Sequence, residues 1–223
     1  MGAVAENLLR IRASLPEGVE LCAVSKFHPV EALREAYGAG QRVFGESRVQ
    51  ELLQKIPQMP ADVRWHFIGH LQTNKVRQII GRTALIESVD SERLLRLIDA
   101  ESEKAGTVTR VLMQLHVAAE ETKFGFTPDE LLDFFRRRGF ESLRATHICG
   151  VMGMATNTDD KERILSDFRT IYDVRRRIAE EIAPDLRGFD TVSMGMSGDY
   201  QLAVGCGSTL VRVGTDIFGA REY

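Results

Sequence analysis

The chain has 223 residues, of which 29 are basic and 32 acidic, so its formal net charge is -3 at pH 7. This length is enough for one large α/β domain with a sizeable core. The balanced charge excludes the basic excess that supports non-specific nucleic-acid binding. The three cysteines lie far apart without a C-x-x-C pair, which predicts reduced core thiols and neither a disulfide framework nor a zinc site.

The first residues lack the apolar segment of a signal peptide, and no run reaches transmembrane length. The sequence therefore predicts a cytoplasmic protein without a membrane segment. An opening helix is predicted over about 3–14, and we expect its apolar stripe to close the bottom of a barrel.

Short apolar segments then alternate with amphipathic stretches. Eight strands are predicted, at 21–26, 42–45, 65–69, 84–88, 110–117, 145–152, 189–194 and 209–214. Helices are expected between them at about 29–38, 46–56, 72–80, 91–105, 128–138, 159–182 and 197–205. The segment TPDE at 127–130 predicts a helix start with a capping box.

Eight strand–helix units predict an α/β fold, a single (β/α)8 TIM barrel over residues 1–223, with the extra helix at about 1–15 and the barrel at about 20–220. A doubly wound open sheet is the alternative. That fold usually carries a glycine-rich fingerprint after its first strand, and SKFHP at 25–29 has no glycine. In a barrel, the active site lies at the C-terminal ends of the strands.

Lys26 stands at the C-terminal end of the first predicted strand. A lysine at a strand end is more often a solvated cap on an apolar segment. The functional alternative is a Schiff-base lysine, whose amine attacks an aldehyde when its pKa is lowered. The position alone does not decide between these two interpretations.

Two small-residue turns follow the last two strands, where this barrel often binds phosphate through exposed backbone N–H groups. Ser197, Gly214 and Thr215 are the donors expected there, although both turns are also compatible with glycines needed only for backbone angles. Arg212 lies two residues before Gly214, so strand alternation directs it into the barrel mouth. A lysine, a phosphate cup and an inward arginine match the three attachment points of pyridoxal 5'-phosphate (PLP): its aldehyde carbon, phosphate and pyridine nitrogen.

Several stretches resemble the pyridoxal phosphate homeostasis protein family, in the family's order and over nearly the whole chain. They are AVSKFHPVEALREAYGAGQRVFGESRVQE (23–51), WHFIGHLQTNKVR (65–77), SVDS (88–91), ETKFGF (121–126), GVMGMAT (150–156) and SMGMSGDYQLAVGCGSTLVRVGTDIFGAR (193–221). The chain departs from the family pattern at Ser47, where the family often has asparagine, and at HVAAEE (116–121), near another frequent asparagine.

The resemblance implies a monomeric or weakly associating fold-type III barrel that carries PLP as a Schiff base on Lys26. It implies that Ser197, Gly214 and Thr215 hold the phosphate and that Arg212 faces the pyridine nitrogen. Family members bind, buffer and deliver PLP and so support vitamin B6 and amino-acid homeostasis. Apo forms of PLP-dependent enzymes are the expected recipients.

A low-activity amino-acid racemase is the runner-up function, because the same barrel serves alanine racemases. Such racemases use two catalytic bases, a lysine on one face of the substrate carbon and a tyrosine on the other, and a C-terminal β-domain helps to build their site. This sequence ends at Tyr223, directly after the eighth strand–helix unit. None of its tyrosines is an obvious candidate for the second base. A cation beside the pyridine nitrogen also disfavours its protonation and weakens the electron sink that a racemase needs. We therefore expect a carrier without catalytic residues.

Two further possibilities rest on single motifs. A metal-dependent hydrolase is conceivable from His66, His70, His116 and His147, but no H-x-H motif ends the first strand, so no metal is predicted.

Lys75 and Arg77 lie in QTNKVR, and such a pair of cations usually belongs to a solvent-exposed helix face. As a hypothesis, they hold the phosphate of a second, transient PLP.

Overall fold

The computed structural model describes residues 2–119 and 124–220. Eight parallel strands form a closed barrel in chain order, and β1 pairs with β8 to close it. The strands are β1 (Glu20–Val24), β2 (Val43–Glu46), β3 (Arg64–Phe67), β4 (Leu85–Val89), β5 (Thr109–Leu115), β6 (Thr146–Gly153), β7 (Thr191–Ser193) and β8 (Leu210–Val213). The predicted TIM barrel is confirmed.

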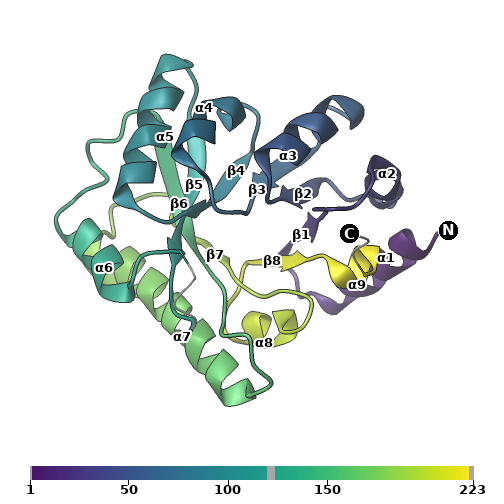
Figure 1. Ribbon diagram of the computed structural model, residues 1–223. Helices are drawn as coiled ribbons and strands as arrows, with labels where there is room; N and C mark the ends of the chain where they lie inside the picture. The colour runs from purple at the N-terminus through teal and green to yellow at the C-terminus, as the bar shows by residue number, and fades with distance from the viewer. Residues whose placement is uncertain (1, 120–123, 221–223) are drawn as a thin grey trace.

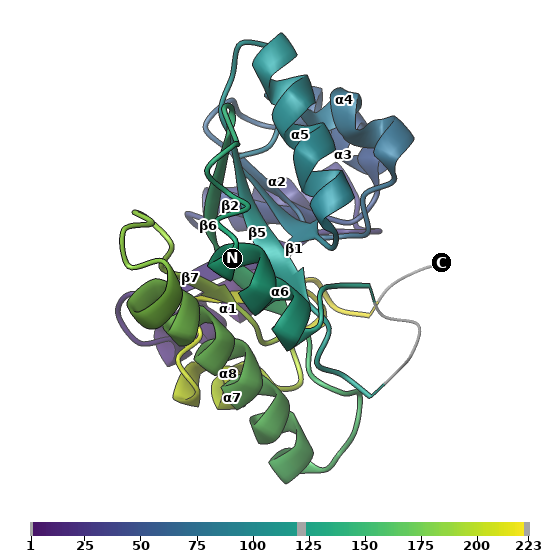
Figure 2. The same ribbon diagram turned by 90° about the vertical axis from the view of Figure 1, so that its left-hand side faces the viewer.

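Helices surround the strands (Figure 1), and α5, α6 and α7 cover the side that faces the viewer in Figure 2. The helical segments are α1 (Ala3–Ser14), α2 (Val30–Gly38), α3 (Val49–Lys55), η1 (Ile56–Gln58), η2 (Thr73–Lys75), α4 (Val76–Ile79), α5 (Glu92–Lys104), α6 (Pro128–Arg136), α7 (Lys161–Arg177), η3 (Ile178–Ile182), α8 (Tyr200–Gly205) and α9 (Thr215–Phe218). The predicted capping box at Thr127 starts α6.

The alternation of side chains along each strand produces two cores. Outward-facing residues such as Ala23 and Phe44 pack in the large core between strands and helices. A smaller apolar cluster draws one or two side chains from most strands and fills the inside of the barrel. It consists of Cys22, Val43, Leu85, Leu112, Cys149, Met152 and Leu210.

The sequence analysis expected the opening helix to close the bottom of the barrel. The structure shows that α1 does not. It packs against α9 and α2 on the outside. Because α9 has only four residues, the position after β8 in the helix ring needs another element, and α1 supplies it. The apolar stripe predicted a buried face correctly, but such a stripe does not specify what the face packs against.

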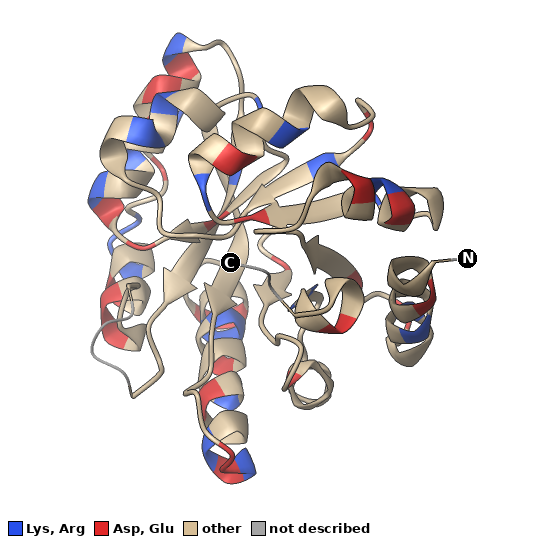
Figure 3. Ribbon diagram, turned by 45° about the vertical axis from the view of Figure 1, so that its right-hand side comes forward, with Lys and Arg blue, Asp and Glu red and all other residues tan. Residues whose placement is uncertain are grey.

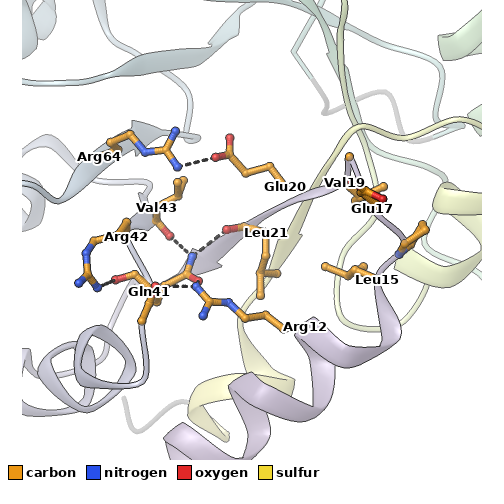
Figure 4. Close-up of a pocket in the computed structure, with 13 residues that line it drawn as sticks. Arg12, Leu15, Glu17, Val19, Glu20, Leu21, Gln41, Arg42, Val43 and Arg64 are labelled. Carbon is orange, nitrogen blue, oxygen red and sulfur yellow. Dashed lines mark hydrogen bonds and ion pairs between the residues drawn. The ribbon is translucent and has the colours of Figure 1, made fainter.

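The end of α1 lines a polar cavity at the N-terminal ends of β1 to β3 (Figure 4). Arg12 donates to the carbonyl oxygens of Ala39 and Gly40, at 3.2 and 2.7 Å, and to the side chain of Gln41 at 2.9 Å. Arg64 pairs with Glu20 at 2.6 Å. These contacts join α1 and the strand starts at the end of the barrel that usually serves stability.

Charged residues of both signs are distributed along the outer helices (Figure 3). This mixed pattern agrees with the nearly balanced composition. Over residues 2–119 and 124–220, no helix is both long and apolar enough to span a membrane.

Candidate functional site

Lys26 lies two residues beyond the end of β1, at the C-terminal mouth of the barrel. Cys22, on the same strand, belongs to the interior cluster, and Lys26 lies in the turn that follows this strand. Lys26 is half-buried. The next residue, Phe27, has φ 68°, a conformation that costs energy for a non-glycine residue and is typical of functional sites.

A buried ion-pair network, which sequence reasoning missed, holds the backbone on both sides of Lys26. The Nζ of Lys55 donates to Glu46 Oε1 and to the carbonyl oxygen of Ser25, both at 2.8 Å. It also contacts Glu51 Oε1 at 2.6 Å, and the same oxygen accepts from the Phe27 N–H at 2.6 Å. The Ser25 hydroxyl donates to Glu46 at 2.6 Å. These contacts fix the direction in which the chain presents Lys26.

The network depends on a strand that begins and ends one residue later than predicted. Glu46 was expected to open a helix, but it is the last residue of β2 and is fully buried. Burial raises the pKa of Glu46, although the Lys55 charge and the hydrogen bonds from Lys55 and Ser25 oppose this effect. Its Oε2 atom is buried without a hydrogen-bond partner in the described structure.

The two predicted phosphate turns meet in the structure. The Gly214 N–H donates to the Ser197 hydroxyl at 3.3 Å, which joins the turn after β7 to the turn after β8. Thr215 is the first residue of α9. Within residues 2–119 and 124–220, the backbone N–H groups of Ser197, Gly198, Thr215 and Asp216 donate to no protein acceptor. Four backbone donors therefore remain available around this junction.

The Arg212 guanidinium is buried inside the barrel, as its register predicted. One nitrogen donates to the Ser193 hydroxyl at 2.5 Å and another to the Gly153 carbonyl oxygen at 2.9 Å. Ser193 in turn donates to Glu87 at 2.5 Å, and Arg212 lies 3.7 Å from the same carboxylate oxygen. The other oxygen of Glu87 contacts His66 Nδ1 at 2.7 Å. Glu87 is thus the carboxylate that compensates for burial of the arginine.

Burial alone would raise the pKa of Glu87. The hydrogen bond from His66 and the charges of His66 and Arg212 outweigh this effect, so the pKa of Glu87 is lowered. Sequence reasoning did not find Glu87, although the acidic residue in the predicted strand ALIES was a usable signal. An inward arginine needs a carboxylate, and few acids lie within the predicted strands.

Among the described residues, no possible metal-binding group contains more than one of the four histidines. His66 pairs with Glu87, His70 Nδ1 with Asp90 at 2.7 Å, and His147 with the Arg187 carbonyl oxygen at 3.0 Å. Cys22, His66 and Glu87 offer ligand atoms within 4.8 Å of one another.

These three groups are poorly suited to a cation. His66 and Glu87 already bond to each other, and the Arg212 charge is 3.7 Å from the carboxylate. Burial and the Glu87 charge raise the pKa of the Cys22 thiol well above its usual value, which disfavours the thiolate that a metal requires. The absence of a metal stays a prediction.

The departure from the family pattern at HVAAEE lies partly outside the described residues, which stop at 119 and resume at 124. Ser47, the other departure, is half-buried directly after β2.

Comparisons with known proteins place the chain among close relatives. Residues 1–222 match the model of the family described as alanine racemase, N-terminal domain. The pyridoxal phosphate homeostasis protein of Schizosaccharomyces pombe is 41% identical over 207 residues, which cover 91% of this chain and 84% of that protein. The homologue of the same name from Aquifex aeolicus is 37% identical over 205 residues, with 92% and 88% coverage.

Solved structures agree with these matches. PipY of Synechococcus elongatus is 36% identical and covers 97% of this chain and 100% of its own; its TM-score is 0.91 without PLP and 0.88 with PLP bound. Alanine racemase from E. faecalis shares the fold, with a TM-score of 0.77 at 19% identity, over 98% of this chain and 58% of the racemase chain. The identities of 37–41% over more than four fifths of both chains show that the chain belongs to the pyridoxal phosphate homeostasis protein family.

Proposed function

We propose that this chain binds PLP reversibly and buffers or delivers it, with Lys26 as the Schiff-base lysine. The observation that carries the proposal is a juxtaposition: Lys26 extends from β1, while Arg212 and Gly214 extend from its hydrogen-bonded neighbour β8. The PipY structure with PLP bound and the names of the relatives support this ligand. When bound, the cofactor's aldehyde would condense with the Lys26 amine, with loss of one water molecule.

Ser197, Gly214 and Thr215 are the proposed phosphate residues, and Gly214 contributes by holding Ser197 because its own N–H is already bonded to the Ser197 hydroxyl. The hydrogen bond between Ser197 and Gly214 holds the two turns together, and the four unused backbone donors suit a phosphate dianion. The proposed phosphate contacts are these backbone N–H groups themselves. A helix dipole is not part of the proposal, since α9 has only four residues. An anion at this junction would satisfy donors that the protein leaves open.

Arg212 is the proposed neighbour of the pyridine nitrogen. Its contacts with Ser193 and Glu87 hold the guanidinium inside the barrel. A cation there disfavours protonation of the pyridine nitrogen, so the bound cofactor would stabilise a substrate carbanion poorly. This supports a carrier over the runner-up, a low-activity amino-acid racemase.

The described tyrosines give the racemase little support. The Tyr37 hydroxyl bonds to Asp62 at 2.7 Å, and the Tyr200 hydroxyl lies 3.0 Å from the Ser14 hydroxyl. Tyr172 is exposed on α7. Tyr223 lies outside the described residues. We propose that the protein is a monomer, which analytical sedimentation would test. We also propose that it delivers PLP to apo-enzymes, which a transfer assay with an apo-enzyme would test.

Borohydride labelling tests the central claim. The protein is mixed with PLP, its absorption spectrum is recorded, and the complex is reduced before peptide mass analysis. We expect a Schiff-base absorption band and a label on Lys26, both lost in Lys26→Ala and both retained in Lys75→Ala. A colourless protein, or a label on another lysine, contradicts the proposal. Rapid, saturable amino-acid turnover that Lys26→Ala abolishes would favour the racemase.

A further inference from the structure

A second cavity opens beside the Lys26 segment, between the loops that follow β2 and β3. It has a volume of about 260 Å³ and is lined by Ser47, Arg48, Val49, Gln50, Phe67, His70, Gln72 and Lys75. Phe67 and Val49 are buried and form an apolar floor, whereas the other lining side chains are polar. Arg77, which the sequence hypothesis placed with Lys75, lines a different cavity.

The side chains that line this cavity carry more positive than negative charge. Arg48 and Lys75 contribute two cations, and none of the eight lining residues is acidic. Across the described parts of the chain, neither cation takes part in an ion pair. The nearest acid along α3, Glu51, is already bonded to Lys55 and to the Phe27 N–H. Two cations beside hydroxyl and amide groups favour an anionic ligand rich in acceptor oxygens.

Close backbone packing builds the cavity walls. A Cβ atom on Gly69 would lie 2.3 Å from the carbonyl oxygen of Ser47, so the two loops touch where only glycine fits. The Ser88 hydroxyl anchors the same loop through the Gly69 carbonyl oxygen at 2.5 Å. On the other wall, the His70 ring bonds to Asp90 and stacks on Phe124 with centroids 3.8 Å apart.

A contact between Arg48 and Phe27 links the cavity to the turn that carries Lys26. The Arg48 guanidinium lies over the Phe27 ring, 4.6 Å from its centroid, and Phe27 follows Lys26 directly. A ligand that engages Arg48 therefore acts on the residue whose strained backbone aims Lys26.

We infer that this cavity binds a phosphate monoester, with Arg48 and Lys75 as its phosphate ligands. If Lys26 binds PLP as proposed above, this cavity holds a PLP molecule non-covalently before or after it reacts with Lys26. This part of the inference rests on the proposed function. Other phosphorylated metabolites carry the same phosphate monoester group. The binding test therefore includes probes that distinguish PLP from these metabolites.

Amide NMR spectra of the full chain test the site, with inorganic phosphate, glycerol phosphate and pyridoxine 5'-phosphate as probes. Pyridoxine 5'-phosphate carries no aldehyde, so Lys26 chemistry does not interfere. We expect shifted amide signals at residues 47–50 and 70–75. Lys75→Gln should weaken binding there about tenfold, as loss of a charged hydrogen bond would. Arg77→Gln, two residues away and outside the cavity, is the matched control and should leave the titration unchanged.

The remaining outcomes separate this site from the Lys26 site. Shifts confined to residues 197–198 and 214–216 overturn the inference and leave the proposed function intact. Shifts confined to residues 47–50 and 70–75 support the inference and contradict the proposed phosphate turns. Shifts at 47–75 that persist unchanged in Lys75→Gln and Arg48→Gln overturn it. Tighter binding of pyridoxine 5'-phosphate than of glycerol phosphate identifies PLP as the source, and equal binding identifies phosphate monoesters in general.

Discussion

Among single residues, Glu87 gives the clearest test of how the buried charge of Arg212 is balanced inside the barrel. Glu87→Gln removes the charge that compensates for buried Arg212, and breaking a buried pair in this way costs about 3–5 kcal/mol of unfolding free energy. Urea unfolding at pH 7 measures this loss. Glu17→Gln, at an exposed position, is the control and should change little. Equal stability of the two variants would contradict the assignment of Glu87 as the partner of Arg212.

The pH dependence of the same residue has a defined sign. Because the pKa of Glu87 is lowered in the folded protein, its stabilising contribution is fully present above the usual value of 4.5. The contribution is lost as the pH falls through the lower folded value. The stability gap between wild type and Glu87→Gln should therefore narrow on acidification below about pH 4.5, as unfolding curves across this range would show.

Glu46 should behave in the opposite way, because burial raises its pKa. A raised pKa contributes stability below the usual value of 4.5, and this is lost as the pH rises through the folded value. Wild type should therefore lose stability relative to Glu46→Gln as the pH rises above 4.5. The same unfolding series measures this trend, and a difference that is independent of pH would contradict it.

These residue-level networks were only partly accessible from the sequence. Lys26, Arg212, Ser197 and Gly214 follow from strand ends and alternation, which are local patterns. Glu87 and Lys55 gain their roles from partners on other strands and helices, and no local pattern encodes such a pairing. Whether Lys26, Ser197, Arg212, Gly214 and Thr215 contact PLP stays a prediction.

At the scale of elements, α1 depends on a polar connection to the start of the barrel. Arg12→Met removes donors to the carbonyl oxygens after α2 and to Gln41, and we expect a loss of about 1.5–3 kcal/mol in unfolding free energy. Arg10→Met, on the exposed face of the same helix, loses a hydrogen bond to Asn7 and should cost under about 0.5 kcal/mol. Similar losses in both variants would mean that α1 is held by its apolar stripe alone.

The loop after β3 provides a test of the second cavity that leaves both cations in place. Gly69→Ala places a Cβ against the Ser47 carbonyl oxygen and should separate the two loops. We expect weaker binding of inorganic phosphate at residues 47–75 with unchanged labelling of Lys26. Gly81→Ser, at a positive-φ glycine with open space around it, controls for general destabilisation. Unchanged phosphate binding in Gly69→Ala would show that the cavity does not need this loop geometry.

The boundaries of most elements were predictable because apolar runs, turn residues and caps are local signals. The exceptions have physical reasons. Glu46 extends β2 although it is charged, since Lys55 and Ser25 satisfy it inside the protein. The position of α1 depends on how short α9 is, and this is a property of the assembled helix ring.

For the whole molecule, PLP should act as a stabilising ligand. At a free concentration of about 100 times its dissociation constant, a ligand adds about 2.7 kcal/mol to the unfolding free energy. For a chain of this size this corresponds to an increase in Tm of about 5–10 °C. Differential scanning fluorimetry measures it, and Lys26→Ala should show a much smaller increase. An identical increase in that variant would mean that Lys26 contributes little to binding.

The overall architecture was predictable because eight repeated strand–helix units allow few closed arrangements. Individual side-chain networks were less predictable, since the barrel brings together strands that are more than a hundred residues apart in the chain. Ser193 and Glu87, which meet inside the barrel, illustrate this separation.

The pairing of β1 with β8 has a consequence for biosynthesis. Lys26 is made well before Arg212, Gly214 and Thr215, which follow it along the chain by most of the barrel, and the two groups meet only when β1 pairs with β8. A nascent or truncated chain therefore has the lysine without the turns beside it. Stable retention of the cofactor would then report that the barrel has closed, which makes the loaded protein its own marker of complete folding.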